Sequence, residues 1–131
     1  MRILIADDDD DDRVLASTAF REIDITLIVD FARDGQELMD KLCGDLKRKL
    51  RLPDLLLLDL NMPKKDGRTA LKEIKSRADL RDLNVIIFST STSEEDKTFT
   101  LGLGARDYIV KPSDYNKLME VFRHISTQLV D

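Results

Sequence analysis

Apolar residues along this chain gather in five short runs, each separated from the next by a longer segment of mixed polarity. The most regular run is Leu55–Leu58, which lies between Pro53 and Pro63 and leads directly into Asp59. Four leucines without polar interruption are typical of a strand buried on both faces, and such strands occur mainly in parallel sheets covered by helices. The other predicted strands are Ile3–Ala6, Thr26–Ala32, Val85–Phe88 and Tyr108–Val110.

Between these runs, apolar residues recur every three or four positions, which is the spacing of an amphipathic helix. The weakest helical segment is the fourth, because its interior contains two threonines and a glycine, which are poor helix formers. Five strands that alternate with five helices predict a doubly wound α/β fold. The predicted helices cover Asp10–Ile23, Gln36–Leu50, Gly67–Ala78, a segment that starts at Ser93, and Asp114–Leu129.

The length, net charge and cysteine content of the chain exclude several classes of protein. A chain of 131 residues with 42% hydrophobic and 36% charged residues is expected to form one soluble globular domain, residues 1–131, without an effector domain. Its net charge of -5 offers no electrostatic footprint for nucleic acid. The N-terminal apolar run is too short for a signal sequence or a membrane span. The single cysteine, Cys43, excludes an internal disulfide and favours a reducing, cytoplasmic location.

Polar residues that could take part in catalysis or ligand binding lie at the ends of four predicted strands. The carboxyl ends of parallel strands meet at one edge of a sheet, where ligands of such folds bind. We therefore expect these side chains to converge at a single site. They are Asp7 and Asp8 after the first strand, Asp59 after the third, Ser89 at the end of the fourth and Lys111 after the fifth.

The chemistry of this set points to phosphate. Clustered carboxylates repel one another and need a cation, and their hard oxygen ligands suit Mg²⁺, which keeps coordination positions open for phosphate oxygens. Lys111 and Ser89 could each bind one phosphate oxygen. Asp59, central in the group, is then a candidate nucleophile for a phosphoryl group. The alternative interpretation is that Asp59 is a loop residue that starts a turn, and spacing alone does not choose between the two.

The run of aspartates from Asp7 to Asp12 is a separate feature. A calcium loop of the helix-loop-helix kind would need glycine at its sixth position and glutamate at its twelfth, but Asp12 and Thr18 stand there. That interpretation therefore fails. We assign Asp7 and Asp8 to the metal site and interpret Asp9 to Asp12 as residues that cap the first helix, whose dipole favours anions at this end.

Together these motifs resemble the response-regulator receiver domain of bacterial two-component signalling, over essentially the whole chain. The chain is most similar to stand-alone receivers that partner phytochrome-type kinases. The resemblance implies a flavodoxin-like sheet with the strand order 2-1-3-4-5. The motifs that carry it are Asp7–Asp8, Leu58–Pro63, Asp66–Gly67, Ser89, Gly104–Ala105, Tyr108 and Lys111–Pro112.

The resemblance also implies roles for the acidic residues. Asp59 would accept a phosphoryl group from a histidine of a sensor kinase or of a histidine phosphotransfer protein. Asp8, Asp59 and the main-chain carbonyl of Asn61 would hold Mg²⁺ directly, with Mn²⁺ as a substitute. Asp7 would act mainly through a metal-bound water.

Further expectations from the resemblance concern the switch and its output. Lys111 would pair with the phosphoryl group, Ser89 would hydrogen-bond to it, and Tyr108 would change its exposure on activation. The Lys111–Pro112 peptide bond would be cis. Output would pass to a downstream protein target or along a phosphorelay, from a monomer or a phosphorylation-linked dimer.

Two other function classes share parts of this pattern. Phosphatases of the haloacid-dehalogenase type also place an aspartate nucleophile after a buried strand, but they carry a second aspartate two residues later, where this chain has Asn61. An adaptor with a receiver fold but no phosphorylation would have lost Asp59, Asp8 or Lys111, and all three are present. We therefore expect a signalling switch and not an enzyme that turns over small substrates.

Overall fold

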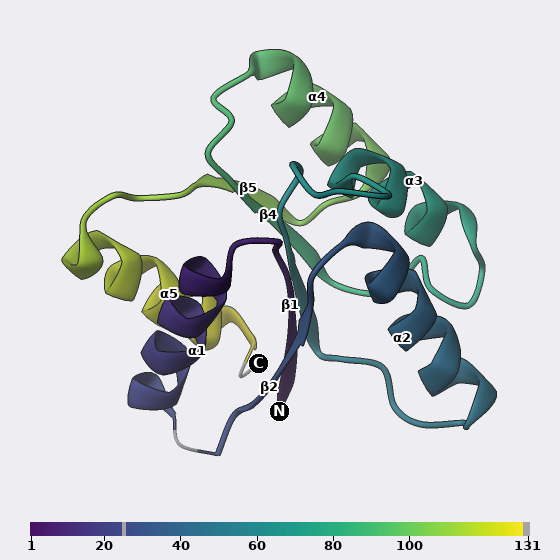
Figure 1. The fold of residues 1–131 in the computed structure, drawn as a ribbon, viewed down its shortest axis with the longest axis horizontal. Helices are drawn as coiled ribbons and strands as arrows, with labels where there is room; N and C mark the ends of the chain where they lie inside the picture. Colours follow the sequence, from purple (N-terminus) through teal and green to yellow (C-terminus); the bar gives the residue numbers. More distant parts are fainter. Residues whose placement is uncertain (25, 130–131) are drawn as a thin grey trace.

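The computed structural model describes residues 1–24 and 26–129 (Figure 1). Its centre is a parallel sheet with the strand order β2-β1-β3-β4-β5, as the resemblance implied. The order places β1, β3 and β4 inside the sheet and leaves β2 and β5 at its edges. The strands are β1 (Arg2–Ala6), β2 (Ile28–Ala32), β3 (Leu55–Leu58), β4 (Val85–Ser89) and β5 (Asp107–Val110).

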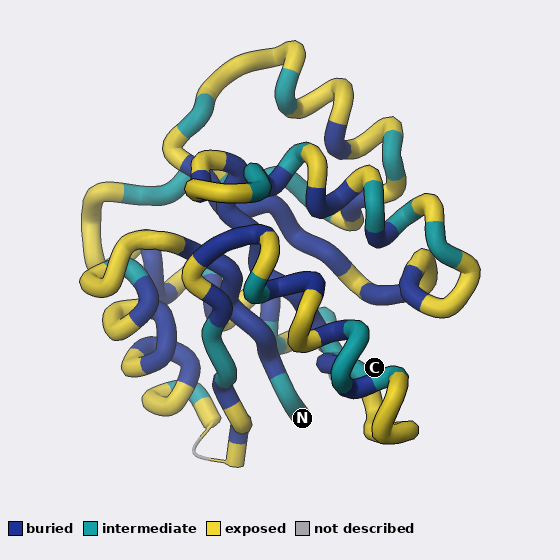
Figure 2. The backbone as a smooth tube through the Cα atoms, turned by 45° about the vertical axis from the view of Figure 1, so that its right-hand side comes forward, coloured by how far each residue is buried: buried dark blue, intermediate teal, exposed yellow. Residues whose placement is uncertain are grey.

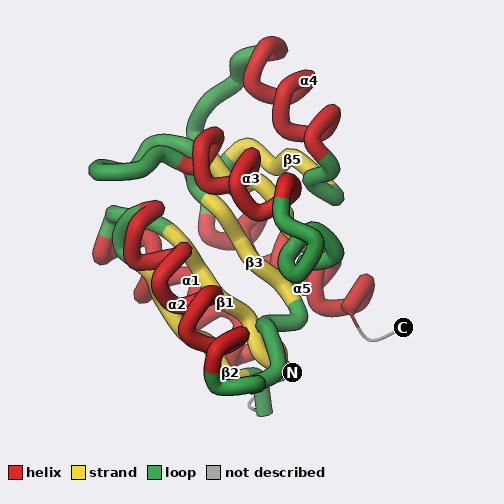
Figure 3. Tube along the Cα trace, turned by 90° about the vertical axis from the view of Figure 1, so that its right-hand side faces the viewer, coloured by secondary structure: helices red, strands yellow, loops and turns green. Residues whose placement is uncertain are grey.

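Helices cover both faces of the sheet, as the predicted doubly wound fold requires (Figures 1 and 3). The first and last helices pack together on one face, and the other three form a layer on the opposite face. No helix of the described ranges is long and apolar enough to cross a membrane. The helices are α1 (Asp10–Ile23), α2 (Gly35–Lys47), α3 (Gly67–Ser76), α4 (Glu94–Leu103) and α5 (Tyr115–Leu129).

The leucine run of β3 supplies both hydrophobic cores. Successive side chains of a strand point to opposite faces of the sheet. Leu56 and Leu58 accordingly pack in the core under α2 and α3, whereas Leu55 and Leu57 pack in the core under α1 and α5. All four are essentially inaccessible to solvent. Figure 2 shows the strands as a mainly buried band between helices that expose their outer faces.

Two predicted boundaries are wrong for local reasons. The second helix ends at Lys47 and not at Leu50, because Lys49 adopts a left-handed conformation with a φ of 58° that ends the helical path. Leu50, counted among the apolar positions of that helix, is 51% exposed. The second strand starts at Ile28 and not at Thr26, because the amide and hydroxyl of Thr26 both donate to Asp24 Oδ1 in a turn. The third helix ends at Ser76, two residues before the predicted Ala78, and the remaining boundaries agree with the prediction to within one residue.

Polar side chains cap the helices that follow the first four strands. Ser93 caps α4 as predicted, since its Oγ accepts the amide of Asp96. Within the aspartate run, only Asp9 is the N-cap of α1, where its Oδ1 accepts the amide of Asp12. Each such cap typically contributes about 1 kcal/mol to the stability of the protein. They also hold the strand-to-helix loops close to the edge of the sheet that is formed by the carboxyl ends of the strands.

Candidate functional site

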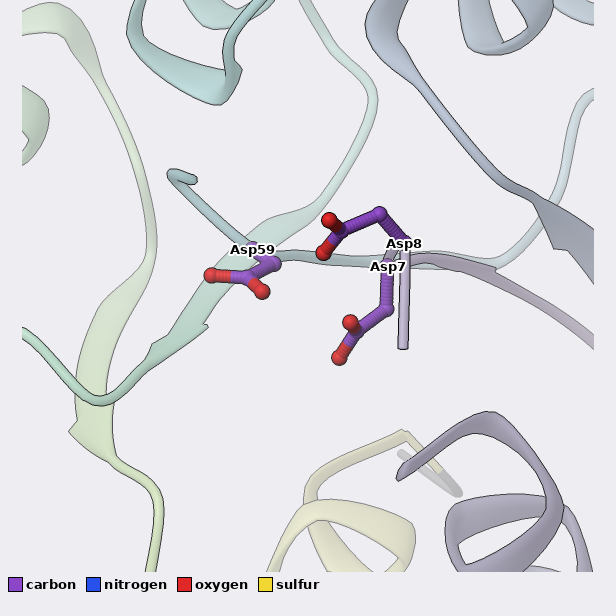
Figure 4. Close-up of side chains that lie close together, drawn as sticks. All are labelled: Asp7, Asp8 and Asp59. Atoms are coloured by element: carbon purple, nitrogen blue, oxygen red, sulfur yellow. The ribbon is translucent and has the colours of Figure 1, made fainter. Parts of the chain in front are cut away.

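Three carboxylates meet where β1 and β3 end (Figure 4). The two strands are neighbours with Ala6 opposite Leu58, so the residues that follow them leave the sheet side by side. The amide of Asp59 donates to the Ala6 carbonyl oxygen at 2.9 Å, which extends the pairing by one residue. Carboxylate oxygens of Asp7, Asp8 and Asp59 lie within 4.8 Å of one another. Asp7 and Asp59 are buried, and Asp8 is exposed to solvent.

Lys111 reaches this group from the end of β5. Its Nζ lies 2.8 Å from Asp7 Oδ2, 2.8 Å from Asp12 Oδ2 and 3.2 Å from Asp59 Oδ2. The side chain is only 11% exposed, and its ammonium lies 5.9 Å from the centre of the Phe88 ring. A single, largely covered cation therefore contacts carboxylates from three different segments.

The expectation of a cis bond between Lys111 and Pro112 is wrong, since the described residues contain no cis peptide bond. The Lys111 amide donates to the Ser89 carbonyl oxygen at 2.8 Å and so continues the pairing of β5 with β4. From that position the long lysine side chain spans the distance to Asp59 by itself. No special turn is needed to direct it inward.

The charges at this edge shift one another's pKa values. Burial raises the pKa of Asp7 to about 6, although hydrogen bonds from Lys111 and from the Asp9 amide act in the opposite direction. Burial alone would lower the pKa of Lys111, but its hydrogen bonds to Asp12 and Asp7 and the charge of Asp59 outweigh burial, so this pKa is raised. Lys111 is therefore fully charged at neutral pH, and burial makes the ionised form of Asp7 less favourable than it is in water.

The raised pKa of Asp7 predicts a pH dependence of stability without metal. A folded-state pKa above the unfolded value means that protonated Asp7 favours the fold, so its contribution is present below about pH 4 and is lost as the pH rises through about 6. Asp7→Asn mimics the protonated side chain. We expect the unfolding free energy of wild type, relative to Asp7→Asn, to fall between pH 4 and pH 7 in urea titrations with a chelator. A difference that does not vary over this interval would contradict the assignment.

Three residues that support the site were not predicted to do so. The buried Arg13 donates from Nη1 to the main-chain oxygen of Asp7 at 2.7 Å, which fixes the loop between β1 and α1. Gly67 packs so closely that a Cβ there would lie 2.2 Å from the Asp59 carbonyl oxygen. Asp12, interpreted above as a capping residue, contacts Lys111 instead. Gly67 belongs to the Asp66–Gly67 motif of the resemblance, but no local pattern distinguished Arg13 or Asp12.

The remaining predicted residues lie near the carboxylates but make other contacts. Ser89 is fully buried, and its Oγ accepts the amide of Ser91 at 3.2 Å. The half-buried Tyr108 donates its hydroxyl to the main-chain oxygen of Ser91 at 2.8 Å. The main-chain N–H of the exposed Asn61 donates to Asp59 Oδ1 at 3.3 Å. Ser89 and Tyr108 thus both hold the loop between β4 and α4.

An ion pair between α3 and α4 is joined to this loop through the Ser91 hydroxyl. Arg68 Nε and Nη2 lie 2.6 Å and 2.7 Å from the two carboxylate oxygens of Asp96, and Ser91 Oγ donates to the same carboxylate at 2.8 Å. The Arg68 guanidinium lowers the pKa of Asp96, so the pair is charged at neutral pH. Arg68 lies next to Gly67, and the contact therefore links the loop that follows Asp59 with the loop that follows Ser89.

Comparisons with known proteins agree with this geometry. A family model described as "response regulator receiver domain" matches residues 3–123. Response regulator Rcp1 of Synechocystis is 35% identical, with 95% of this chain and 86% of that protein covered. The crystal structure of the phosphorylated cyanobacterial phytochrome response regulator RcpA has a TM-score of 0.90 at 34% identity, over 99% of this chain and 94% of that one. The Mn²⁺-bound form of Rcp1 has a TM-score of 0.80 at 30% identity, over 96% and 91%.

The family match covers residues 3–123, and this range includes every strand end that contributes a side chain to the acidic site. The chain is therefore a member of the response-regulator receiver-domain family of two-component signalling proteins.

Proposed function

We propose that this receiver accepts a phosphoryl group on Asp59 from a sensor histidine kinase or a histidine phosphotransfer protein, in a reaction that depends on Mg²⁺. The observation that carries the proposal is the position of Asp59, a buried carboxylate beside the Asp7–Asp8 pair and in contact with the Lys111 ammonium. Phosphoryl transfer needs positioning and charge neutralisation more than covalent assistance, and these side chains supply both.

The donor set fits a hard divalent cation. Three carboxylates with oxygens within 4.8 Å of one another carry a charge that Lys111 alone does not balance. We assign Mg²⁺, or Mn²⁺ in its place, to Asp7, Asp8, Asp59 and the main-chain carbonyl of Asn61. When bound, the ion would neutralise charge on phosphoryl oxygens and leave coordination positions for them.

The chain's own residues then account for the transfer. A carboxylate oxygen of Asp59 attacks the phosphorus of the phosphohistidine; the P–O bond forms as the P–N bond breaks, and the histidine nitrogen takes the electron pair. Lys111, 3.2 Å from Asp59 Oδ2, neutralises the charge on the transferred group. Ser89 is buried at the neighbouring strand end, where a rotation of its hydroxyl away from the Ser91 amide would direct it toward the phosphoryl group.

Signal output in this proposal is a change in protein contacts or an onward phosphorelay. Tyr108 and Ser89 both bond to Ser91, so a movement of Ser89 toward the phosphoryl group disturbs the loop that Tyr108 holds. Through Asp96 the same loop is bound to α4 and to Arg68 of α3. We propose that Tyr108 changes its exposure in this step. The receiver itself would turn over no small substrate beyond its own phosphorylation and dephosphorylation.

Incubation with acetyl phosphate and Mg²⁺ tests the proposal directly. Intact-mass analysis is expected to show one added phosphoryl group that is stable in acid and labile in base, as an acyl phosphate is. The same reaction with a chelator in place of Mg²⁺ is expected to give no product. Absence of the added mass in the presence of Mg²⁺ would refute the proposed function.

Metal binding also predicts a stabilisation. A ligand that binds only the native state stabilises it by mass action, by about 1.4 kcal/mol at ten times its dissociation constant. For a domain of this size that raises the melting temperature by about 5 °C. We expect Mg²⁺ to produce such a rise by thermal melting, and Asp8→Asn to reduce it, with Asp82→Asn as a surface control. An unchanged melting curve across millimolar Mg²⁺ would argue against the metal site.

A further inference from the structure

Asp12 differs from the other acidic partners of Lys111 in its origin. Asp7 and Asp59 follow strands, whereas Asp12 lies in the first turn of α1. Its side chain is 39% exposed, and its Oδ2 lies 2.8 Å from Lys111 Nζ, as close as that of Asp7. It is not part of the group of carboxylates that could share a metal ion. Its contact with the lysine therefore needs a separate explanation.

The other aspartates of the run are engaged elsewhere or free of such contacts. Asp9 caps α1 through the amide of Asp12, and Asp10 pairs with Arg13. Asp11 is exposed, and among the described residues its carboxylate has no hydrogen bond or ion pair. Only one residue of the four that follow Asp8 is thus directed at the lysine. The cap bond from Asp9 holds the backbone from which Asp12 reaches it.

An ammonium has three N–H donors, and the three carboxylates around Lys111 provide one acceptor for each. The contacts to Asp7 and Asp12 are shorter than the contact to Asp59 by 0.4 Å. Two donors are therefore held firmly, and the third is directed at the phosphoacceptor. Transfer of a phosphoryl group onto Asp59 places new oxygens beside this third donor and leaves the other two contacts in place.

We propose that Asp12 is a positioning residue for phosphorylation. It anchors the Lys111 ammonium to α1, so that one N–H donor already faces Asp59 when the phosphoryl group arrives; the inference rests on the proposed function of Asp59. A lysine side chain has a flexible four-carbon stem, and its position must be held by its partners. Interactions arranged before the reaction need no reorganisation during it and lower the barrier accordingly.

Labelling rates test this role. Asp59 is labelled in Mg²⁺ with acetyl phosphate and, separately, with phosphoramidate, in wild type, Asp12→Asn and Asp11→Asn. Asp11→Asn removes the same charge from the same helical turn without touching the lysine, so it measures the general effect of charge. We expect Asp12→Asn to be slower than Asp11→Asn by about tenfold with both donors. Asp11→Asn is expected to stay within about twofold of wild type, as for an exposed charge.

A double-mutant cycle shows whether Asp12 acts through the lysine. In a Lys111→Ala background, Asp12→Asn is expected to cause no further slowing, because the ammonium that it positions is gone. Equal slowing in both backgrounds would overturn the proposal. Asp12→Ser, which keeps a polar side chain in the first turn, is a second variant with the same expected loss if Asp12→Asn melts below the assay temperature.

The labelling results distinguish a failure of the role of Asp12 from a failure of the proposed function of Asp59. Wild-type labelling together with equal rates for Asp12→Asn and Asp11→Asn would overturn the role of Asp12 and leave the phosphoacceptor in place. A wild type that takes no label would overturn the proposed function, and the inference about Asp12 with it.

Discussion

Asp59→Asn is expected to abolish labelling by acetyl phosphate while the fold persists. The amide is too weak a nucleophile for the reaction, and no other carboxylate follows β3 directly; Asp59 is also buried beside the Lys111 ammonium. The substitution also removes one charge from three crowded carboxylates, so stability without metal should hold or rise.

Intact-mass analysis after incubation with acetyl phosphate and Mg²⁺ provides the measurement, and circular dichroism confirms the fold. Asp82→Asn is the matched control, since it makes the same chemical change at an exposed position on the surface. It should label like wild type. If Asp59→Asn took up a phosphoryl group to the same extent as wild type, the acceptor would have to be another residue.

Lys111→Met should have the second largest effect, on both stability and phosphorylation. Methionine keeps much of the apolar stem but removes the only ammonium among the described residues that contacts Asp7 and Asp59, whose side chains are 4% and 8% exposed. Removal of one partner from a buried ion pair leaves an uncompensated charge and costs about 3 kcal/mol. Phosphorylation should slow as well, since no cation remains to neutralise the transferred group.

Urea unfolding at pH 7.5 with a chelator measures the stability effect. Part of the loss should be recovered in Mg²⁺, because the added cation neutralises the same carboxylates, and part below pH 6, where Asp7 becomes protonated. Lys97→Met is the control, because Lys97 is exposed on α4. Equal unfolding free energies for Lys111→Met and Lys97→Met would show that Lys111 does not balance the buried charges.

The sequence alone determined the fold class and the centre of the site. Leu55–Leu58 could only be buried on both faces, which requires a sheet between two layers of helices. In a parallel sheet the carboxyl ends of the strands share one edge. The site can therefore be predicted for the residues that directly follow strands, which are Asp7, Asp8, Asp59 and Lys111. These conclusions depend on periodicity and chain order, which are local properties that a sequence displays directly.

Only the tertiary structure decided which neighbours complete the site. Within the run from Asp9 to Asp12 the residues are chemically identical, and the packing of α1 against α5 brings Asp12 within reach of the Lys111 side chain. The Asp12–Lys111 contact joins residues 99 positions apart in the chain, so it is set by packing and not by local spacing. The trans bond before Pro112 and the contact of Ser89 with the Ser91 amide are local, but the motifs of the sequence did not display either of them.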